Sequence, residues 1–311
     1  MNQHLASSQS ISQKPDTSFP IFVYGSLKPG ELAYPLISSL VAATRPATLS
    51  DYVLQIADGV AYARKQEGYQ VSGFELRFTE PEQAYEAISH FEGTESTRPR
   101  YLWSTAILDS QRVNVLVSRG RINNATFAED WSIQVDDVFS KGFPWVRKKL
   151  SESIEALNLN KISDPKRDEY WDSYFQLQST LLYLWSIQER LELFRLGATS
   201  QDISLGQRRR EFQADPQLQE AIKAANIDHS LSAHSYRNPS GLGTSAENSP
   251  LMTWFEIRSN ITHHAKGSER EVDKVITASV DHFNTLLNYF ELCSPKLALL
   301  FADLTPLRKG L

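Results

Sequence analysis

The sequence predicts an α+β domain, built as a small mixed β-barrel, followed by an all-α helical bundle. Apolar residues from Phe19 to about Val117 follow strand patterns, whereas those beyond Asp168 recur every three or four residues, as in helices. A length of 311 residues accommodates two domains of ordinary size. We place the boundary in the charged segment Lys161–Asp168. The expected domains span 19–160 and 165–295, with tails over 1–18 and 296–311.

The first predicted strand, Ile21–Tyr24, ends abruptly in the loop Gly25–Gly30. Gly25 leaves the backbone N–H groups of this loop open to close approach, which suits a carboxylate or a carbonyl oxygen. A phosphate-binding loop is excluded, because Glu31-Leu32 stands where that motif requires Lys followed by Ser or Thr. A plain turn is the alternative interpretation.

The rest of the first half alternates between strands and one helix. A strand with alternating apolar residues is expected over Tyr69–Phe78, and a helix that starts with proline over Pro81–Phe91. Ser104–Leu108 and Arg112–Val117 are expected to form a hairpin. Strands with one internal helix are typical of an α+β domain.

The second half has the periodicity of helices. The expected helices are Val146–Leu157, a long segment from Tyr174 to Phe194, Gln217–Ala225, Pro250–Ala265 and Glu269–Leu292. Ser230–Ser249 is rich in Ser, Asn and Gly and is expected to be a mobile loop, and the tail from Ser294 is expected to be irregular.

The composition excludes several classes of protein. The net charge of −5 offers nucleic acid no strong overall attraction. Cys293 is the single cysteine, so no internal disulfide can form and a reducing compartment is expected. No apolar run has the length of a membrane span. The polar Met1–Ser18 has no apolar core and is interpreted as a disordered tail, not a signal peptide. We therefore expect a cytoplasmic protein that binds no membrane.

One ordered set of motifs lies in the first half. Tyr24-Gly25-Ser26-Leu27 follows the first strand, Val71–Leu76 forms a later one, Glu92-Gly93 follows the helix, and Tyr101 opens the next strand. This order resembles the gamma-glutamylcyclotransferase-like family, which includes the AIG2-like proteins. The resemblance covers about Pro20 to Leu116.

The resemblance implies intramolecular acyl transfer, in which a γ-glutamyl compound cyclises to 5-oxoproline and releases an amine. Glu92 occupies the family's catalytic position and would act as general acid and base, with a pKa raised by partial burial. Tyr24, Gly25, Ser26, Leu27 and Tyr101 would bind the substrate. The reaction requires neither a cofactor nor a metal.

Two positions depart from the family pattern. Ser89 stands where the family usually has Asp, and Trp103 stands where it has Arg. The alternative interpretation of Glu92 is a solvated residue at the end of a helix, next to the glycine that terminates it.

A second motif lies in Trp254–Lys266, between two long predicted helices. Arg258 and His263, with Asn260 between them and Lys266 beyond, resemble the Arg-x4–6-His motif of the HEPN family. This resemblance covers about Tyr170–Leu292. It implies a bundle that forms homodimers and, in many members, cleaves RNA without a metal.

In this hypothesis Arg258 stabilises charge on phosphorus and His263 acts as acid or base, with Asn260 and Lys266 in support. The two residues lie poorly aligned on one helix, so a two-fold dimer would have to bring two pairs together. The alternatives are that Arg258 pairs with Glu256 or Asp281, or that the helical half is a non-catalytic interaction module. Arg208-Arg209-Arg210 is interpreted as a solvated surface run that would flank any RNA path.

Overall fold

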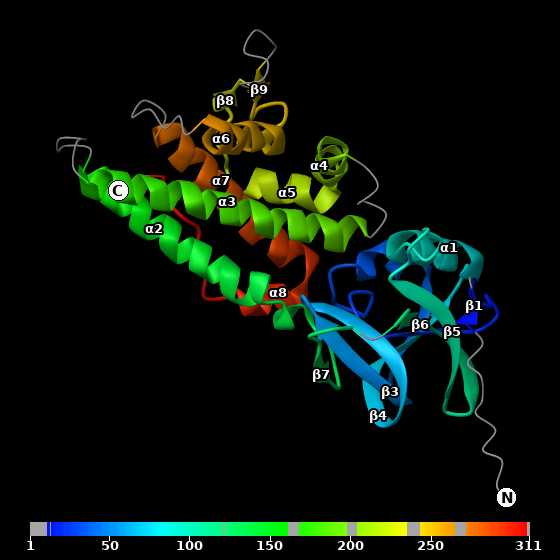
Figure 1. The fold of residues 1–311 in the computed structure, drawn as a ribbon. Helices are drawn as coiled ribbons and strands as arrows, with labels where there is room; N and C mark the ends of the chain where they lie inside the picture. The colour runs from blue at the N-terminus through cyan, green and yellow to red at the C-terminus, as the bar shows by residue number, and fades with distance from the viewer. Residues whose placement is uncertain are drawn as a thin grey trace, which may run out of the picture. The chain divides into compact units, whose positions relative to one another are not determined.

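The computed structural model describes residues 11–12, 14–120, 122–160, 168–197, 204–234, 243–264 and 272–309. These residues form two compact units, coloured along the chain in Figure 1. Unit 1 comprises the described residues up to Asp136 together with Leu193–Gly197, and unit 2 comprises Asp137–Glu192 and the described residues from 204 onward. The units therefore divide at Asp136, earlier in the chain than Lys161–Asp168, because the segment that follows Asp136 packs among helices.

Unit 1 is built on one mixed sheet of seven strands in the order β1-β5-β6-β2-β4-β3-β7. β2 and β6 are parallel, and the other neighbours are antiparallel. Among the described residues β1 and β7 lie at opposite ends of this order and do not pair, so the expectation of a closed barrel is wrong. The strands are β1 (Ile11–Ser12), β2 (Ile21–Val23), β3 (Val41–Ala57), β4 (Val60–Phe78), β5 (Tyr101–Leu108), β6 (Gln111–Ser118) and β7 (Thr126–Ala128).

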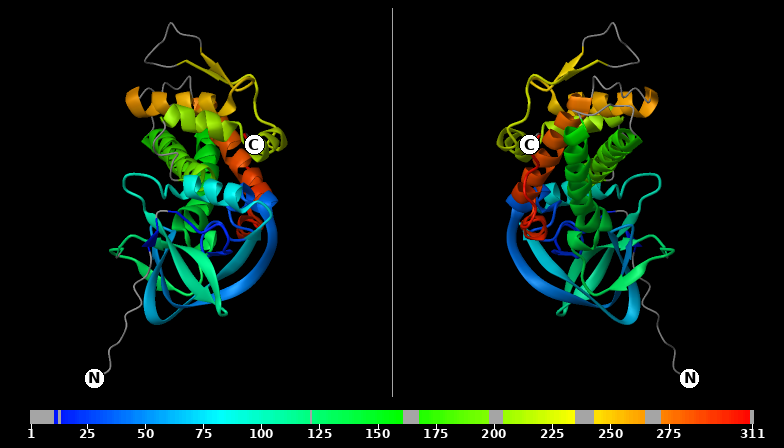
Figure 2. Two further views of the ribbon diagram at one scale, coloured as in Figure 1. Left: turned by 90° about the vertical axis from the view of Figure 1, so that its right-hand side faces the viewer. Right: turned by 90° about the vertical axis from the view of Figure 1, so that its left-hand side faces the viewer.

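β3 and β4 form one long hairpin, which bends as a single curved ribbon in Figure 2. The two-residue turn is Asp58-Gly59, with φ of 50° and 72°, as a type I′ turn requires. The register shifts between Ser50 and Tyr52, where Asp51 has a φ of 61°. Such irregularities increase strand twist and bending. The long curved hairpin thus brings residues that are far apart in the sequence, such as Val41 and Phe78, next to each other in the sheet.

The predicted elements of unit 1 are largely present. The hairpin β5–β6 turns through Asp109-Ser110, both with positive φ. The helix α1 (Pro81–Glu92) begins with proline and buries the stripe Ala84, Ile88 and Phe91. Residues 11, 12 and 14–18 of the expected tail have defined positions: β1 pairs with β5, and the backbone N–H of Asp16 donates to Asn114 Oδ1 at 3.2 Å. Met1–Ser10 lies outside the described residues.

Unit 2 is helical, as predicted. Its helices are α2 (Phe143–Asn160), most of α3 (Asp168–Leu196), α4 (Leu205–Gln213), α5 (Pro216–Ala224), α6 (Pro250–His264), α7 (Val272–Cys293) and α8 (Pro295–Leu300). The expectation of an irregular tail from Ser294 is wrong for Pro295–Leu300, where Ser294 caps α8 by accepting a hydrogen bond from the Leu297 N–H, whereas residues 301–309 contain neither helix nor strand. The described ends of the predicted loop contain two short paired strands, β8 (Ser232–Ala233) and β9 (Thr244–Ser245).

The interior of unit 2 contains stacked aromatic rings and buried charges. The ring of Phe143 stacks on Phe283 at 4.6 Å between centroids. The interpretation of Arg208 and Arg209 as solvated is wrong: they are 8% and 3% exposed and pair with Glu192 and Glu189 at 3.0 and 3.1 Å. In the part of the chain that is described, every helix is too short or too polar to cross a membrane.

Candidate active site

Glu92 is the last residue of α1, and local backbone chemistry holds it there. Gly93 follows with a φ of 63°, and the N–H groups of Gly93 and Thr94 donate to carbonyls of the last turn. A left-handed residue at this position ends a helix, and glycine adopts it without strain. Gly197 lies against the same turn, where an added Cβ would come within 2.5 Å of the Phe91 carbonyl oxygen. The end of α1 at Glu92 is therefore fixed by the turn at Gly93 and by the close approach of Gly197.

The Glu92 carboxyl group has no hydrogen bond or ion pair with any residue that the structure describes. The side chain is half-buried. Burial raises the pKa of Glu92 to about 7, and the charge of Arg100 opposes this by lowering it. Two residues further on, the hydroxyl of Thr94 is buried and also lacks a partner in the described chain. Because α1 ends here, its dipole also disfavours a negative charge. Glu92 is a carboxyl group that can exchange a proton near neutral pH.

Two tyrosines, Tyr24 and Tyr101, lie close enough to Glu92 to be affected by its charge. Burial raises the pKa of Tyr101 well above its ordinary value, and the negative charge of Glu92 adds to the effect, as it does at Tyr24. The Tyr24 hydroxyl donates to the Leu116 carbonyl and the Tyr101 hydroxyl to the Ala61 carbonyl, both at 2.7 Å. Tyr62 stacks on Tyr101 at 5.4 Å between ring centroids. The two hydroxyl protons are thus committed to backbone carbonyls and are not available to Glu92.

The loop after β2 presents a set of backbone donors. The N–H groups of Gly25, Ser26 and Leu27 have no acceptor among the residues described. Gly30 has a φ of 81°, which explains the glycine there. An added Cβ on Gly25 would touch only Ala61 Cβ at 3.7 Å, an ordinary contact. A side chain at position 25 would therefore fit without a clash, so the space around Gly25 does not by itself require glycine.

Two buried charged residues hold this loop, and the sequence analysis missed both. Lys28 is 2% exposed and donates to the Asp130 carboxylate and the Trp131 carbonyl. Glu31 is 1% exposed and accepts a hydrogen bond from the Ile133 N–H at 3.2 Å. A Lys and a Glu in a turn are usually solvated, so the local sequence does not predict that these two side chains are buried. The contacts fix the loop that carries the free N–H groups.

The two departures from the family pattern touch each other. The indole N–H of Trp103 donates to the Ser89 hydroxyl oxygen at 3.2 Å, and both residues are buried. Both side chains are neutral, whereas the resemblance in the sequence leads one to expect Asp and Arg at these positions. The two residues that differ from the expected pattern therefore form a neutral hydrogen bond with each other.

The structure describes only part of the second predicted site, namely Arg258 and Asn260. Arg258 lies beside the ring of Phe255 at 5.9 Å and pairs with neither Glu256 nor Asp281; the latter pairs with Lys309 at 2.6 Å. The Asn260 amide donates to the His234 carbonyl at 3.0 Å. Lys266 and the side chain of His263 lie outside the described residues. In the described chain no three His, Cys, Asp or Glu side chains come together as metal ligands.

The comparisons with known proteins concern unit 1. Residues 21–118 match the family model described as gamma-glutamyl cyclotransferase, AIG2-like. A crystal structure of an uncharacterized protein from Pyrococcus horikoshii aligns at 14% identity and a TM-score of 0.30, covering 37% of this chain and 90% of that one. No curated protein matches the sequence. The family match supports the resemblance found in the first half, spans about a third of the chain and does not extend to the helices, for which the HEPN resemblance is unsupported. Residues 21–118 are therefore similar to the gamma-glutamyl cyclotransferase, AIG2-like domains, and the cluster around Glu92 lies within them.

Proposed function

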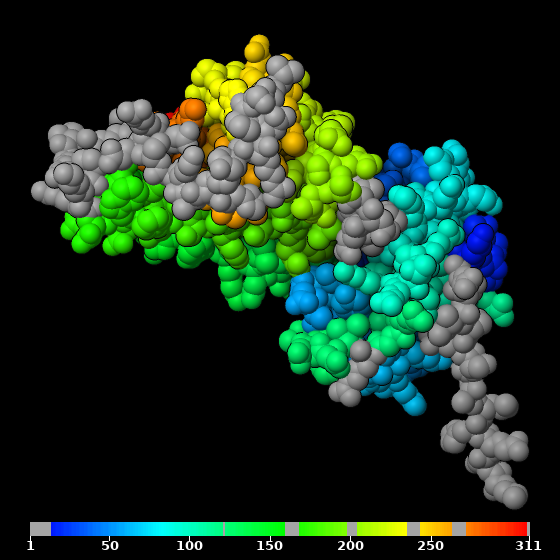
Figure 3. All heavy atoms as spheres, turned by 45° about the horizontal axis from the view of Figure 1, so that its top comes forward, coloured from blue at the N-terminus to red at the C-terminus, as the bar shows by residue number. Residues whose placement is uncertain are grey.

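We propose that unit 1 catalyses the cyclisation of a γ-glutamyl amine to 5-oxoproline, with Glu92 as general acid and base. The observation that carries the proposal is the carboxyl group of Glu92: it has no partner in the described chain, its pKa is raised to about 7, and it lies within the residues that match the family model. Perturbed carboxyl groups of this kind are frequent in active sites. In the space-filling view (Figure 3), atoms with the colour of α1 form part of the surface of unit 1.

In the reaction one carbon–nitrogen bond forms and another carbon–nitrogen bond breaks. The substrate's free α-amine attacks its own γ-carbonyl carbon and forms the five-membered ring. The bond from that carbon to the second amine then breaks. Glu92 takes the proton that the attacking nitrogen loses and returns it to the leaving nitrogen, so no water is consumed. A group with a pKa near the working pH serves in both directions.

The loop donors would act on the oxygen atoms of the substrate. The N–H groups of Gly25, Ser26 and Leu27 suit the substrate carboxylate or the negative charge that develops on the attacked carbonyl oxygen. Lys28 and Glu31 hold the loop before substrate arrives, so its donors need little reorganisation. Because ring closure occurs within one molecule, holding it in the reactive geometry contributes much of the rate enhancement.

The test is release of 5-oxoproline from a panel of γ-glutamyl dipeptides. We expect wild-type protein to release it, Glu92→Gln to lose the activity, and Glu95→Gln to retain it. Glu95 is an exposed carboxylate three residues away and makes a matched control. Absence of 5-oxoproline with every γ-glutamyl compound, or full activity in Glu92→Gln, would contradict the proposal.

A ribonuclease activity of unit 2 is not proposed. The described geometry engages Asn260 with the backbone and Arg258 with an aromatic ring, and the family match does not reach this unit. Binding of RNA and formation of a homodimer through the helices have no supporting observation either.

A further inference from the structure

A recess of about 450 Å³ lies in unit 1, at the end of the sheet where β7 pairs with β3 (Figure 1). Pockets that bind small molecules have volumes of about 300–1,000 Å³. The described lining consists of one β3 residue and of residues before and within β7, namely Gln55, Ile122, Asn123, Asn124, Ala125 and Phe127. Neither Glu92 nor the loop donors are among these residues. The recess therefore does not belong to the proposed active site.

Gln55 is the unusual residue of this recess. Its side chain is 2% exposed, yet neither Oε1 nor Nε2 has a hydrogen-bond partner among the described residues. Buried amides are nearly always paired, because an unpaired one has lost its hydrogen bonds to water without replacement. A leucine of similar size at this position of the strand would avoid that loss. The exception is explained if a molecule in the recess supplies the missing partner.

Two further amides line the recess from the turn before β7. Asn123 and Asn124 are exposed, and neither side chain has a hydrogen-bond partner in the described chain. Asn124 has a φ of 57°, a left-handed conformation that asparagine adopts more readily than most residues. Each amide offers both N–H donors and a C=O acceptor. Together with Gln55, the described lining presents three such groups and no charge.

The lining also contains one exposed aromatic ring. Phe127 is 63% exposed, and its ring lies 6.5 Å from that of Tyr69, which is 46% exposed. Phe127 lies directly opposite Gln55 in the sheet, so the two side chains point to the same face. The face of an aromatic ring is weakly negative and attracts the weakly positive C–H groups of a ligand. The ring and the Gln55 amide can therefore act on one molecule.

We propose that this recess binds a neutral sugar ring. Hydroxyl groups on adjacent sugar carbons both donate and accept hydrogen bonds, so one amide can accept from the first and donate to the second. The Gln55 amide binds one such hydroxyl, and those of Asn123 and Asn124 bind others. The C–H groups on one face of the sugar lie against Phe127. The described lining does not compensate a charge for its lost water, so neutral sugars are favoured over acidic or amino sugars.

Binding is tested on the full chain with three neutral probes, the methyl glycosides of glucose, galactose and mannose. The side-chain amide resonances of Gln55, Asn123 and Asn124 are followed by NMR during each titration. We expect at least one glycoside to shift them with a Kd of about 1 mM, as suits a ligand of this size. The corresponding uronic acid and amino sugar should bind about tenfold more weakly. Absence of binding by all three glycosides up to about 50 mM, or equal binding of the charged forms, overturns the proposal.

Two variants test whether the sugar lies in this recess. Gln55→Leu should weaken binding of the glycoside about tenfold, because one hydrogen bond is lost. Phe127→Ala removes the aromatic contact at an exposed position and should weaken binding about tenfold as well. Gln83→Leu on α1 and Phe175→Ala on α3 make the same changes at other exposed positions and should leave the Kd unaltered.

An unchanged Kd in both Gln55→Leu and Phe127→Ala overturns the proposal, because the sugar would then bind elsewhere. If Gln55→Leu does not fold, Phe127→Ala decides alone, since its side chain is mainly in contact with solvent. Release of 5-oxoproline from the dipeptide panel should be the same in Phe127→Ala and in wild type. The outcome at the recess is thus distinguishable from the outcome for the proposed function.

Discussion

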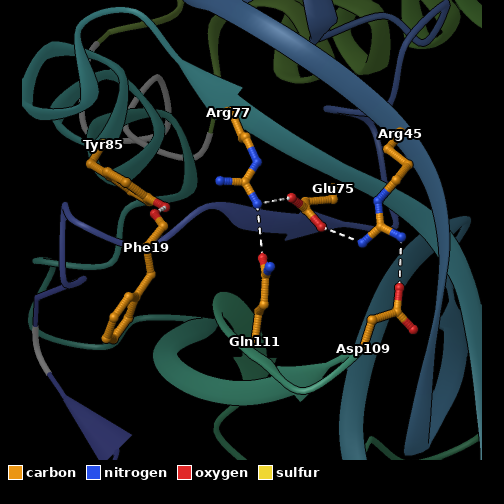
Figure 4. Close-up of polar contacts among 7 residues, drawn as sticks. All are labelled: Phe19, Arg45, Glu75, Arg77, Tyr85, Asp109 and Gln111. Atoms are coloured by element: carbon orange, nitrogen blue, oxygen red, sulfur yellow. Dashed lines mark hydrogen bonds and ion pairs between the residues drawn. The ribbon is translucent and has the colours of Figure 1, made fainter.

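Two carboxylates of unit 1, Glu75 and Glu92, have opposite surroundings. Glu75 on β4 is 4% exposed and binds Arg45 at 2.5 Å and Arg77 at 2.8 Å. Figure 4 shows the network continuing from these arginines to Asp109 and Gln111, at 2.6 and 2.9 Å. Glu92 at the end of α1 has no such partner in the described chain, and burial raises its pKa to about 7.

The difference separates a structural carboxylate from one available for chemistry. Each oxygen of Glu75 pairs with one guanidinium group, that of Arg45 on β3 or that of Arg77 on β4. Glu75 therefore links the two strands, and its negative charge is neutralised by these partners. Glu92 bears the cost of desolvation without an internal partner, which natural folds tolerate mainly at functional sites. The predictions below test this contrast, in order of decreasing effect.

The largest expected effect is on activity. Glu92→Gln should lower kcat for 5-oxoproline formation by about 10²–10⁴, because positioned proton transfer contributes roughly that factor. Glu75→Gln should stay within a few-fold of wild type, because its side chain takes no part in the reaction. Both are measured by quantifying 5-oxoproline under substrate saturation. Equal losses in the two variants would show that general damage to unit 1, not the chemistry of Glu92, is being measured.

The same two variants should change stability in opposite directions. Glu75→Gln should lower the free energy of unfolding by about 1–2 kcal/mol: a buried ion pair is lost, but both arginines are half-exposed and return to water. The folded pKa of Glu92 lies above its unfolded value, so wild type loses stability as pH rises from about 4.5 through about 7. Glu92→Gln should therefore be more stable than wild type by about 1–3 kcal/mol at pH 8 and nearly equal to it at pH 4.5, by urea unfolding.

Unit 2 contains a buried histidine, His282, whose ring has neither a hydrogen-bond partner in the described chain nor contact with solvent. His282 is fully buried, its ring lies 4.7 Å from Trp185 and 5.2 Å from Trp254, and neither nitrogen has a partner in the described chain. Burial lowers the pKa of His282 to about 3. Its contribution to stability is present above pH 6.5 and is lost as pH falls toward 3.

We expect the free energy of unfolding of wild type to fall by about 2 kcal/mol more than that of His282→Phe between pH 6.5 and 5. The variant keeps an aromatic ring beside the two indoles. His229→Phe changes an exposed histidine and should leave the pH dependence unaltered. Parallel pH profiles for wild type and His282→Phe would show that folding does not lower the pKa of His282.

The smallest expected effect concerns Arg100, whose charge acts on Glu92. Arg100 lowers the pKa of Glu92, opposing burial, so Arg100→Gln should raise the midpoint of the pH–activity profile by a few tenths of a unit. Arg98→Gln removes a nearby exposed charge that does not act on Glu92 and is the control. A midpoint that moves equally in both variants would indicate a general change of surface charge.

The sequence predicted the elements whose signals are local. The proline at the start of α1, its apolar stripe and Gly93 at its end all follow from residues within a few positions of one another. The turn at Asp109-Ser110 and the helices of unit 2 are local in the same sense. The sequence analysis did not predict β3, because the first half of this strand is mainly exposed and contains Pro46, a residue that is unusual within strands.

The contacts around the site required the three-dimensional structure. The carboxylate of Asp130 reaches Lys28 across about a hundred residues of sequence, and Trp103 reaches Ser89 from another strand. The burial of Arg208 and Arg209 depends on two glutamates in α3, which no pattern within their own helix reveals. The motif order around Glu92 was visible in the sequence, whereas the missing partner of its carboxyl group was not.

The measurement that tests the central claim most directly is the titration of Glu92 itself. With glutamate labelled at the carboxyl carbon, the resonance assigned by its loss in Glu92→Gln can be followed by NMR from pH 3 to 9. The account predicts a midpoint at about pH 7. A midpoint near 4.5, the value of a solvated glutamate, would contradict it.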